Sequence, residues 1–169
     1  MLQMKNISKS FPGVKALDNV SMNLEDGDIL SLVGENGAGK STLIKILSGA
    51  YSLDTGEIWI DGEQITKTSP STMIEKGVAV IYQELMLIPH FTVAENIYHG
   101  RYPVTKFGKI DYKKINEDTA GIMKELHLPV KPTEIVAELS VAKRQMVEIG
   151  KALSRNAKII VLDEPTAVL

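Results

Sequence analysis

Eight consecutive residues, Gly34 to Ser41, form the pattern in this sequence that is best suited to chemistry. They fit the phosphate-binding loop GxxxxGK[ST] at every defined position. In such a loop the glycines let backbone N–H groups turn inward around phosphates, and the next helix adds positive potential at its N-terminus. Lys40 would reach the β- and γ-phosphates, and Ser41 would ligate Mg²⁺. The alternative is an ordinary glycine-rich turn between a strand and a helix.

A second pattern combines an apolar run with two acidic residues. The run Ile159–Leu162 leads directly into Asp163 and Glu164. A buried strand of this kind would bring both acids to the carboxyl edge of a sheet, where ligands bind. Asp163 would support Mg²⁺ directly or through water, and Glu164 would orient or deprotonate an attacking water. Alone, such a pair reads as a solvated loop, but the phosphate-binding pattern favours the functional interpretation.

Three short apolar runs, at 29–33, 78–82 and 159–162, predict strands that are buried on both faces. Helical patterns separate them, which is typical of a parallel α/β sheet. One of these helices is predicted from Gly39 to Ser48, with Gly49 ending it.

Alternating residues near the N-terminus predict a different kind of sheet. Residues 57–60 alternate, Asp61-Gly62 forms a two-residue hairpin turn, and residues 63–66 return. Residues 2–7 and 20–24 are candidate partner strands. An antiparallel sheet is therefore expected to flank the parallel core.

The residues between the second and third apolar runs are mostly helical in pattern and too numerous for a simple crossover. Asp111 can cap one helix and Ser140 another. The expected apolar positions are Ile115, Thr119, Ile122 and Leu126 in the first helix and Ala142, Met146, Ile149 and Leu153 in the second. This insertion predicts a small helical subdomain.

The composition narrows the function further. The 169 residues include 19 Lys and Arg, 21 Asp and Glu and no Cys. The absence of Cys excludes disulfides, thiolate metal sites and a Cys nucleophile. A net charge of −2 with short basic runs argues against a nucleic-acid partner. The chain begins without a secretory signal pattern and has no apolar run of membrane-spanning length, so a soluble, cytoplasmic domain is expected.

Together the motifs resemble the ABC-type ATPases, and more closely the ATP-binding subunits of bacterial monosaccharide importers of the ribose type. The similarity extends over nearly the whole chain, in family order. It is carried by Phe11–Leu17, Gly34–Leu43, Val80–Glu84, Phe91–Ile97, Leu139–Lys143 and Val161–Thr166.

The resemblance implies roles that spacing alone leaves open. Phe11 matches the aromatic residue that stacks on adenine, although a core or turn residue is the ordinary interpretation. Gln83 matches the glutamine that contacts Mg²⁺ and the lytic water, whereas an isolated Gln is usually only a polar strand end. Ser140 matches the signature serine, which faces the ATP of an opposing domain; the alternative is a simple helix cap. The signature departs from LSGGQ at its last three positions, Val141, Ala142 and Lys143.

The resemblance therefore implies ATP and Mg²⁺ as cofactors and a full set of site residues. Those expected to act in catalysis are Glu164, Gln83 and Lys40. Those expected to bind nucleotide are Phe11, Gly34, Glu35, Asn36, Gly37, Ala38, Gly39, Lys40, Ser41, Thr42 and, in trans, Ser140. Those expected to hold Mg²⁺ are Ser41, Gln83 and Asp163.

The expected fold class is α/β: a P-loop NTPase (RecA-like) core with an antiparallel β-subdomain and an inserted helical subdomain. Residues 1–86 and 158–169 would form the core with the β-subdomain, and residues 87–157 the helical part. In the family a later strand, which carries a switch histidine, lies between the phosphate-loop strand and the strand ending at Asp163. That strand lies beyond Leu169, so 1–169 is expected to be a partial ATPase domain of a longer protein.

The implied function is ATP binding and hydrolysis that drive import of a monosaccharide, at the cytoplasmic face of the membrane. The implied partners are a second ATPase domain in a head-to-tail dimer, membrane permease subunits and, indirectly, a sugar-binding protein. Two alternatives stay open. The chain could be a catalytically incomplete nucleotide-binding fragment, or an ABC ATPase with a role other than import.

Overall fold

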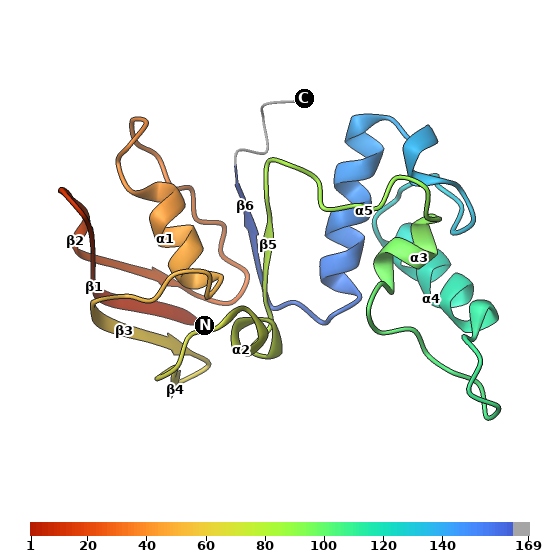
Figure 1. Cartoon of the computed structure of the whole chain (residues 1–169), viewed down its shortest axis with the longest axis horizontal. Coiled ribbons are helices and arrows are strands. Elements are labelled where there is room, and N and C mark those ends of the chain that lie inside the picture. Colours follow the sequence, from red (N-terminus) through yellow and green to blue (C-terminus); the bar gives the residue numbers. More distant parts are fainter. Residues whose placement is uncertain (164–169) are drawn as a thin grey trace. The chain divides into compact units, whose positions relative to one another are not determined.

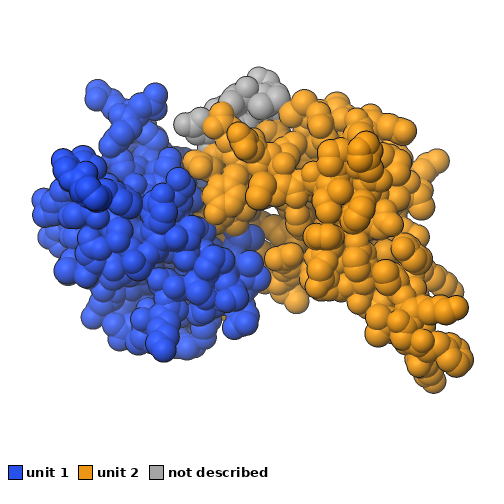
Figure 2. Space-filling model, in the orientation of Figure 1, with its two compact units in different colours: residues 1–79 blue, residues 80–169 orange. Residues whose placement is uncertain are grey.

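The structure, a computed structural model, describes residues 1–163. These residues form α/β architecture, as predicted, and the chain divides into two compact units, Met1–Ala79 and Val80–Leu169 (Figures 1 and 2). Among the described helices, none is both long and apolar enough to span a bilayer.

The first unit contains a four-stranded antiparallel sheet in the order β2-β1-β3-β4 (Figure 1). Its strands are β1 (Leu2–Phe11), β2 (Val14–Leu24), β3 (Thr55–Ile60) and β4 (Glu63–Gln64). Phe11 pairs with Val14 at the first hairpin, and Leu2 lies between Leu24 and Ile60. The predicted antiparallel sheet is therefore confirmed.

The hairpin between β3 and β4 turns at the predicted dipeptide. Asp61 has φ 51° and Gly62 has φ 80°, so both residues adopt the left-handed conformation that a tight turn of this hand requires. Ile60 then pairs with Glu63. The Asp-Gly pair thus fixes the register that buries Ile58 and Ile60 on one face.

Helices α1 (Lys40–Leu47) and α2 (Pro70–Glu75) complete the first unit. Gly49 follows α1 with φ 75°, and a Cβ there would lie 2.4 Å from the carbonyl carbon of Ser69. Only glycine fits this helix end, as the sequence predicted. The buried side chains of the unit come from the sheet and from both helices and include Leu2, Met4, Ile7, Ile46, Ile58 and Met73.

The second unit is mostly helical. Its elements are β5 (Val78–Ile81), whose first two residues precede the division, α3 (Val93–Ile97), α4 (Tyr112–Glu125), the 3₁₀ turn Val136–Glu138, α5 (Val141–Leu153) and β6 (Ile159–Leu162). The core between the helices consists of Val93, Ile97, Met123, Val130, Val136, Leu139 and Val147.

The predicted caps of the two long helices are present. The Asp111 carboxylate accepts the Lys114 N–H at 3.0 Å, and the Ser140 hydroxyl accepts the Lys143 N–H at 3.4 Å. In α4 the buried residues include Ile115 and Thr119, as expected.

The expected buried face of α5 was wrong. Its buried residues are Val147, Glu148, Gly150 and Ala152, while Ala142 is exposed and Met146, Ile149 and Leu153 are only partly buried. The reason is the close approach of α4, since a Cβ on Gly150 would meet the Met123 side chain at 2.8 Å. Because Gly150 has no side chain, α5 can pack closely against α4 on this face, and a glycine does not contribute to an apolar sequence pattern.

The expected strand at 29–33 was also wrong. β5 and β6 form a two-stranded sheet, whereas residues 29–33 have no strand conformation. Ile29 is 97% exposed and Val33 is 93% exposed. An apolar run becomes a buried strand only beside other strands, and no strand among residues 1–163 pairs with this one.

Candidate functional site

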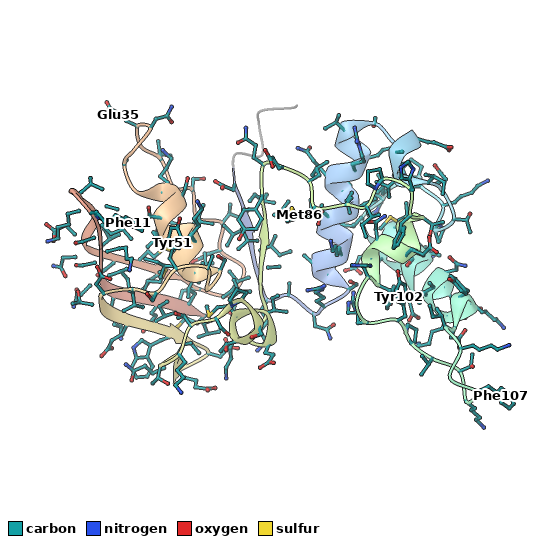
Figure 3. The ribbon with its side chains drawn as sticks, in the orientation of Figure 1. Phe11, Glu35, Tyr51, Met86, Tyr102 and Phe107 are labelled. Carbon is teal, nitrogen blue, oxygen red and sulfur yellow. The ribbon has the colours of Figure 1, made fainter. Side chains whose placement is uncertain are left out.

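The phosphate-binding pattern forms a loop that leads into α1. Gly37 and Gly39 have φ values of 87° and 92°, so the loop depends on two left-handed glycines. A Cβ on Gly39 would lie 2.5 Å from the carbonyl oxygen of Ala16, so no other residue fits there. The Ala38 N–H donates to the Glu35 carbonyl at 3.1 Å and closes the turn. The loop therefore has a fixed shape and exposes its backbone, with Glu35 at its tip (Figure 3).

The N-terminus of α1 is not capped by any side chain. Gly39, the N-cap residue, makes no side-chain hydrogen bond, and the first turn contains no acidic residue. The first N–H groups of this eight-residue helix are therefore free of the side-chain acceptors that usually satisfy them. An anion at this position would complete their hydrogen bonds.

Lys40 lies over this loop. Its ammonium donates to the Gly34 carbonyl at 2.5 Å and to the Glu35 carbonyl at 2.9 Å. The charge is thus held above the exposed backbone, where a phosphate could replace both carbonyls as its partner. The loop residues and Lys40 therefore have the chemistry that a nucleotide phosphate requires.

Phe11 ends β1 on the same unit, and its ring contacts two side chains. It meets Tyr51 edge-to-face, with centroids 5.4 Å apart, and the Lys9 ammonium lies 5.7 Å from its centroid. Figure 3 shows Phe11 and Tyr51 as neighbours. Sequence reasoning missed Tyr51, because no local pattern indicates that the chain after α1 brings this residue beside Phe11.

Gln83 and Asp163 follow the two strands of the second unit. The Asp163 N–H donates to the Ile81 carbonyl at 2.9 Å, so the carboxyl ends of β5 and β6 lie together. Gln83 is exposed two residues after β5, and Asp163 follows β6 directly. Both residues therefore follow strands that end at the same edge of the sheet, and for Asp163 this is the edge that the sequence predicted. Glu164 lies outside the described residues.

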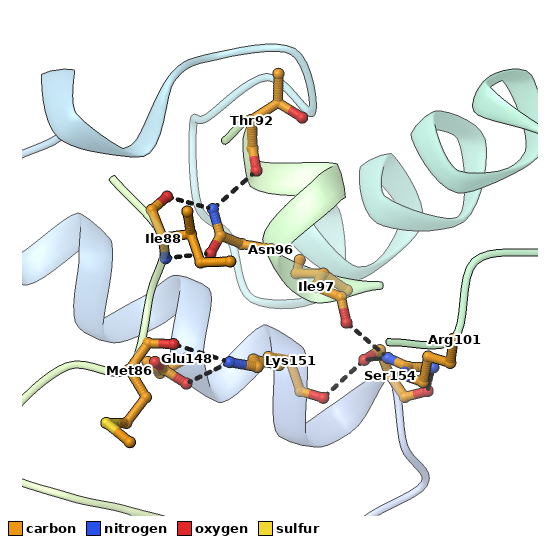
Figure 4. A network of polar contacts seen from close by, with 9 residues as sticks. All are labelled: Met86, Ile88, Thr92, Asn96, Ile97, Arg101, Glu148, Lys151 and Ser154. Atoms are coloured by element: carbon orange, nitrogen blue, oxygen red, sulfur yellow. Dashed lines mark hydrogen bonds and ion pairs between the residues drawn. The ribbon is translucent and has the colours of Figure 1, made fainter. Parts of the chain in front are cut away.

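A network of polar contacts holds the segment that follows Gln83 (Figure 4). The Lys151 ammonium donates to the Met86 carbonyl at 3.2 Å and lies 3.7 Å from the Glu148 carboxylate. The buried Asn96 side chain accepts the Ile88 N–H at 2.7 Å and donates back to the Ile88 carbonyl at 3.0 Å. Sequence reasoning missed this network, because Asn96 was used only as part of the Phe91–Ile97 resemblance and Lys151 belongs to none of the six stretches.

The network connects two predicted functional segments within the second unit. Lys151 is in the last turn of α5, the helix whose N-cap is Ser140. Met86 lies three residues after Gln83. Ser140 itself is exposed, and its hydroxyl oxygen caps the helix. The cap and an outward-facing role for Ser140 are therefore compatible.

The part of the chain that the structure describes does not cluster metal ligands by itself. Among residues 1–163, no group of three or more His, Asp and Glu side chains is placed to hold an ion. The predicted ligands are instead a hydroxyl (Ser41), an amide (Gln83) and a carboxylate (Asp163). All are hard oxygen donors, which fit Mg²⁺ when substrate phosphates and water complete the coordination.

Comparison with known proteins identifies the family. Residues 17–167 match the family of ABC transporters. The chain belongs to the ABC transporter family. This membership confirms the recognition of an ABC-type ATPase from the six motifs.

One relative and two solved structures illustrate the similarity. The xylose import ATP-binding protein XylG of Thermoanaerobacter pseudethanolicus is 52% identical over 171 aligned positions, which cover all of this chain and 34% of the relative. The chain spans about a third of the length of the curated relatives it matches.

The first structure is the ADP conformation of MJ1267, an ATP-binding cassette of an ABC transporter. It has a TM-score of 0.84 and 33% identity, over 99% of this chain and 70% of that one. The second is a dimeric, post-hydrolysis state of the cassette MJ0796 bound to ADP and Pi. It has a TM-score of 0.79 and 26% identity, and the match covers 100% of this chain and 76% of that one. The fold is therefore that of an ABC ATPase cassette.

Proposed function

We propose that this chain is part of a longer subunit that binds and hydrolyses ATP to drive import of a monosaccharide. The observation that carries the proposal is the Gly34–Ser41 loop, with an uncapped helix N-terminus and the Lys40 ammonium held over its backbone. The similarity to XylG, a xylose import protein, supports sugar import, and the ribose-type resemblance of the motifs supports a monosaccharide.

The loop residues bind the phosphates in this proposal. Backbone N–H groups within Gly34–Thr42 that are not used inside the loop donate to phosphate oxygens, and Lys40 exchanges its two carbonyl partners for the β- and γ-phosphates. Glu35, Asn36, Gly37, Ala38 and Gly39 contribute backbone amides, and Phe11 stacks on the adenine.

The remaining residues position the metal and the water. Ser41, Gln83 and Asp163 would hold Mg²⁺, which supplies charge neutralisation at the phosphates. Glu164 orients and deprotonates the attacking water, and Gln83 keeps that water in place.

Partners follow from the same proposal. Ser140 and the first amides of α5 would face the γ-phosphate bound to a second ATPase domain in a head-to-tail dimer, and the similarity to MJ0796, a dimeric cassette, supports such pairing. Permease subunits would receive the motion, a sugar-binding protein would deliver the sugar, and the subunit would lie on the cytoplasmic face of the membrane. Residues 1–86 and 158–169 would form the core, and residues 87–157 the helical subdomain.

Two measurements test the function. The first is binding of a fluorescent ATP analogue to the chain. Replacing Lys40 by Ala should weaken binding about 10-fold or more, since a charge-assisted hydrogen bond contributes roughly 1.5–3 kcal/mol. Lys67→Ala should bind normally, because Lys67 is exposed and lies outside the loop and α1. Equal binding by the Lys40 variant would contradict the nucleotide site.

The second measurement separates the import function from its alternatives. In the longer protein, Glu164→Gln should retain ATP binding while hydrolysis and growth on the transported monosaccharide fail. We expect little or no turnover from the 169-residue chain alone. Turnover by this chain that is lost in both Lys40→Ala and Glu164→Gln would refute the interpretation as an incomplete fragment. Normal growth of the Glu164→Gln strain on every sugar tested would favour a role other than import.

A further inference from the structure

One segment of the second unit exposes apolar and basic side chains together. Residues 101–112 leave α3 and return to α4 as a hairpin, in which Val104 bridges Ile110 and the Thr105 N–H donates to the Lys109 carbonyl at 2.8 Å. Phe107 lies at the tip of this hairpin, away from the core (Figure 3). The turn is therefore an ordered projection.

The apolar side chains of this hairpin are unusually exposed. Phe107 is 91% exposed, Val104 is 64% exposed, and Ile110 and Tyr112 are also among the exposed large apolar residues. Exposing one such side chain is normal for a soluble protein, but four within nine residues indicate a surface that is covered by something else.

The charge of the segment is opposite to that of the chain. Residues 101–114 include five basic residues and one acidic residue, whereas the whole chain has a net charge of −2. Lys113 and Lys114 form ion pairs with Glu117 and Asp118, and Arg101 is hydrogen bonded to the Ile97 carbonyl.

Two lysines of the segment are therefore available to bind an anionic partner. Lys106 and Lys109 are exposed on either side of Phe107, and neither has an ion pair or side-chain hydrogen bond within residues 1–163. An aromatic tip between two unpaired lysines is complementary to an anionic lipid surface, where the ring enters the headgroup boundary and the ammonium groups meet phosphates.

We propose that the hairpin 104–110 docks on the surface of an anionic membrane, with Phe107 inserted at the interface and Lys106 and Lys109 paired with lipid phosphates. This contact is independent of nucleotide, because none of the residues that we assign to ATP lies in the hairpin. It is weak and reversible by itself, as expected of a single small anchor.

The experiment is co-sedimentation of the chain with vesicles at low ionic strength. Vesicles of phosphatidylglycerol and phosphatidylcholine in equal parts should bind the chain, and vesicles of phosphatidylcholine alone should not. Binding should fall as salt is added, because the attraction is screened within a Debye length. Absence of binding to the mixed vesicles would overturn the proposal.

Two variants identify the hairpin as the contact. The double change Lys106→Glu/Lys109→Glu should weaken binding roughly 20-fold or more, since each lysine near an anionic surface contributes about fivefold. The matched control, Lys67→Glu/Lys131→Glu, changes the net charge equally at exposed positions elsewhere and should affect binding much less. An equal loss of vesicle binding in both variants would indicate a general charge effect and would refute the assignment of the contact to the hairpin.

Phe107 is tested separately. Phe107→Ser should weaken binding roughly tenfold, whereas Ile74→Ser, at an exposed apolar position of α2, should not. In a Trp59→Phe background, Phe107→Trp should show a blue-shifted emission with the mixed vesicles. An unshifted emission, or capture only by vesicles that contain permease protein, would contradict a lipid contact. Circular dichroism checks that each variant is folded.

Discussion

At the scale of single residues, Phe11 is held in place by side chains of its own unit. The ring is fixed by the edge of Tyr51 and by Lys9, so its orientation does not depend on a bound base. The Lys9 ammonium is itself held at 2.7 Å by Asp54, and this hydrogen bond lowers the pKa of that carboxyl. Phe11 is therefore part of a small, preorganised cluster.

Removal of this ring should weaken nucleotide binding. We expect Phe11→Ala to reduce affinity for ATP roughly 5- to 150-fold, since stacking on an aromatic ring contributes about 1–3 kcal/mol per base. Phe11→Trp should retain binding, because a larger ring can still stack. Isothermal titration with ATP and with inorganic triphosphate checks the cause. The triphosphate should bind both variants alike, and a loss for both ligands would indicate damage to the phosphate loop instead.

The residues of the phosphate loop could be predicted from sequence because their spacing is itself the signal. Gly34, Gly39 and Lys40 occupy defined positions of the GxxxxGK[ST] pattern, and the structure gives Gly39 a left-handed conformation that favours glycine. Tyr51 could not be predicted in the same way, since its contact with Phe11 depends on where the chain turns after α1.

At the scale of elements, tertiary packing explains why some helices and strands predicted from apolar patterns are present and others are not. The predicted helices at α1, α4 and α5 are present because caps and apolar spacing are local properties. The strand at 29–33 is absent because a strand requires partners far away in sequence, and the described residues offer none. The buried face of α5 was misjudged because Gly150, which carries no apolar signal, leaves the room that the Met123 side chain of α4 fills.

Two glycines in the helical unit provide a matched test of this packing. A Cβ on Gly150 would meet Met123 at 2.8 Å and Ile122 at 3.2 Å, whereas a Cβ on Gly121 would meet nothing within 4 Å. Gly150→Val should therefore lower the free energy of unfolding by about 1–3 kcal/mol through overpacking. Gly121→Ala should raise it by roughly 0.5–1 kcal/mol, because alanine favours the helix. Urea denaturation measures both changes, and a neutral Gly150→Val would show that α5 can move away.

Asn96 offers a second test, at the segment after β5. Its buried amide satisfies both backbone groups of Ile88 and also donates to the Thr92 carbonyl at 3.1 Å. Asn96→Ala should lower stability by roughly 2–4 kcal/mol, because buried partners lose their hydrogen bonds. Hydrogen exchange at the Ile88 amide should accelerate with it. As a control, Asn116→Ala in α4, where the side chain makes no hydrogen bond within residues 1–163, should leave exchange at Ile88 unchanged and should not lower stability, because alanine favours the helix. Unchanged protection of the Ile88 amide in the Asn96 variant would contradict the assignment.

At the scale of the whole molecule, the run at 29–33 exposes four apolar side chains, Ile29, Leu30, Leu32 and Val33. Ile29 and Val33 are almost fully exposed, and such surface promotes association. Ile29→Ser/Val33→Ser should lower the fluorescence of bound 8-anilinonaphthalene-1-sulfonate and reduce light scattering on concentration. Circular dichroism should not change, because these side chains are not in either core. Unaltered dye binding would show that the dye binds to apolar surface elsewhere in the protein.

Strand β5, rather than the division into two units, determines where the chain can be cut. The boundary after Ala79 falls inside β5, a strand that pairs with β6 of the second unit. Gly77 precedes this strand with φ 83°, so the backbone turns there before β5 begins. A separately expressed first unit should therefore end at Gly77, and a second should begin at Val78. A cut after Ala79 would leave the first two residues of β5 unpaired at the end of the first product. In the second product, β6 would lose part of its partner strand and expose an unpaired edge.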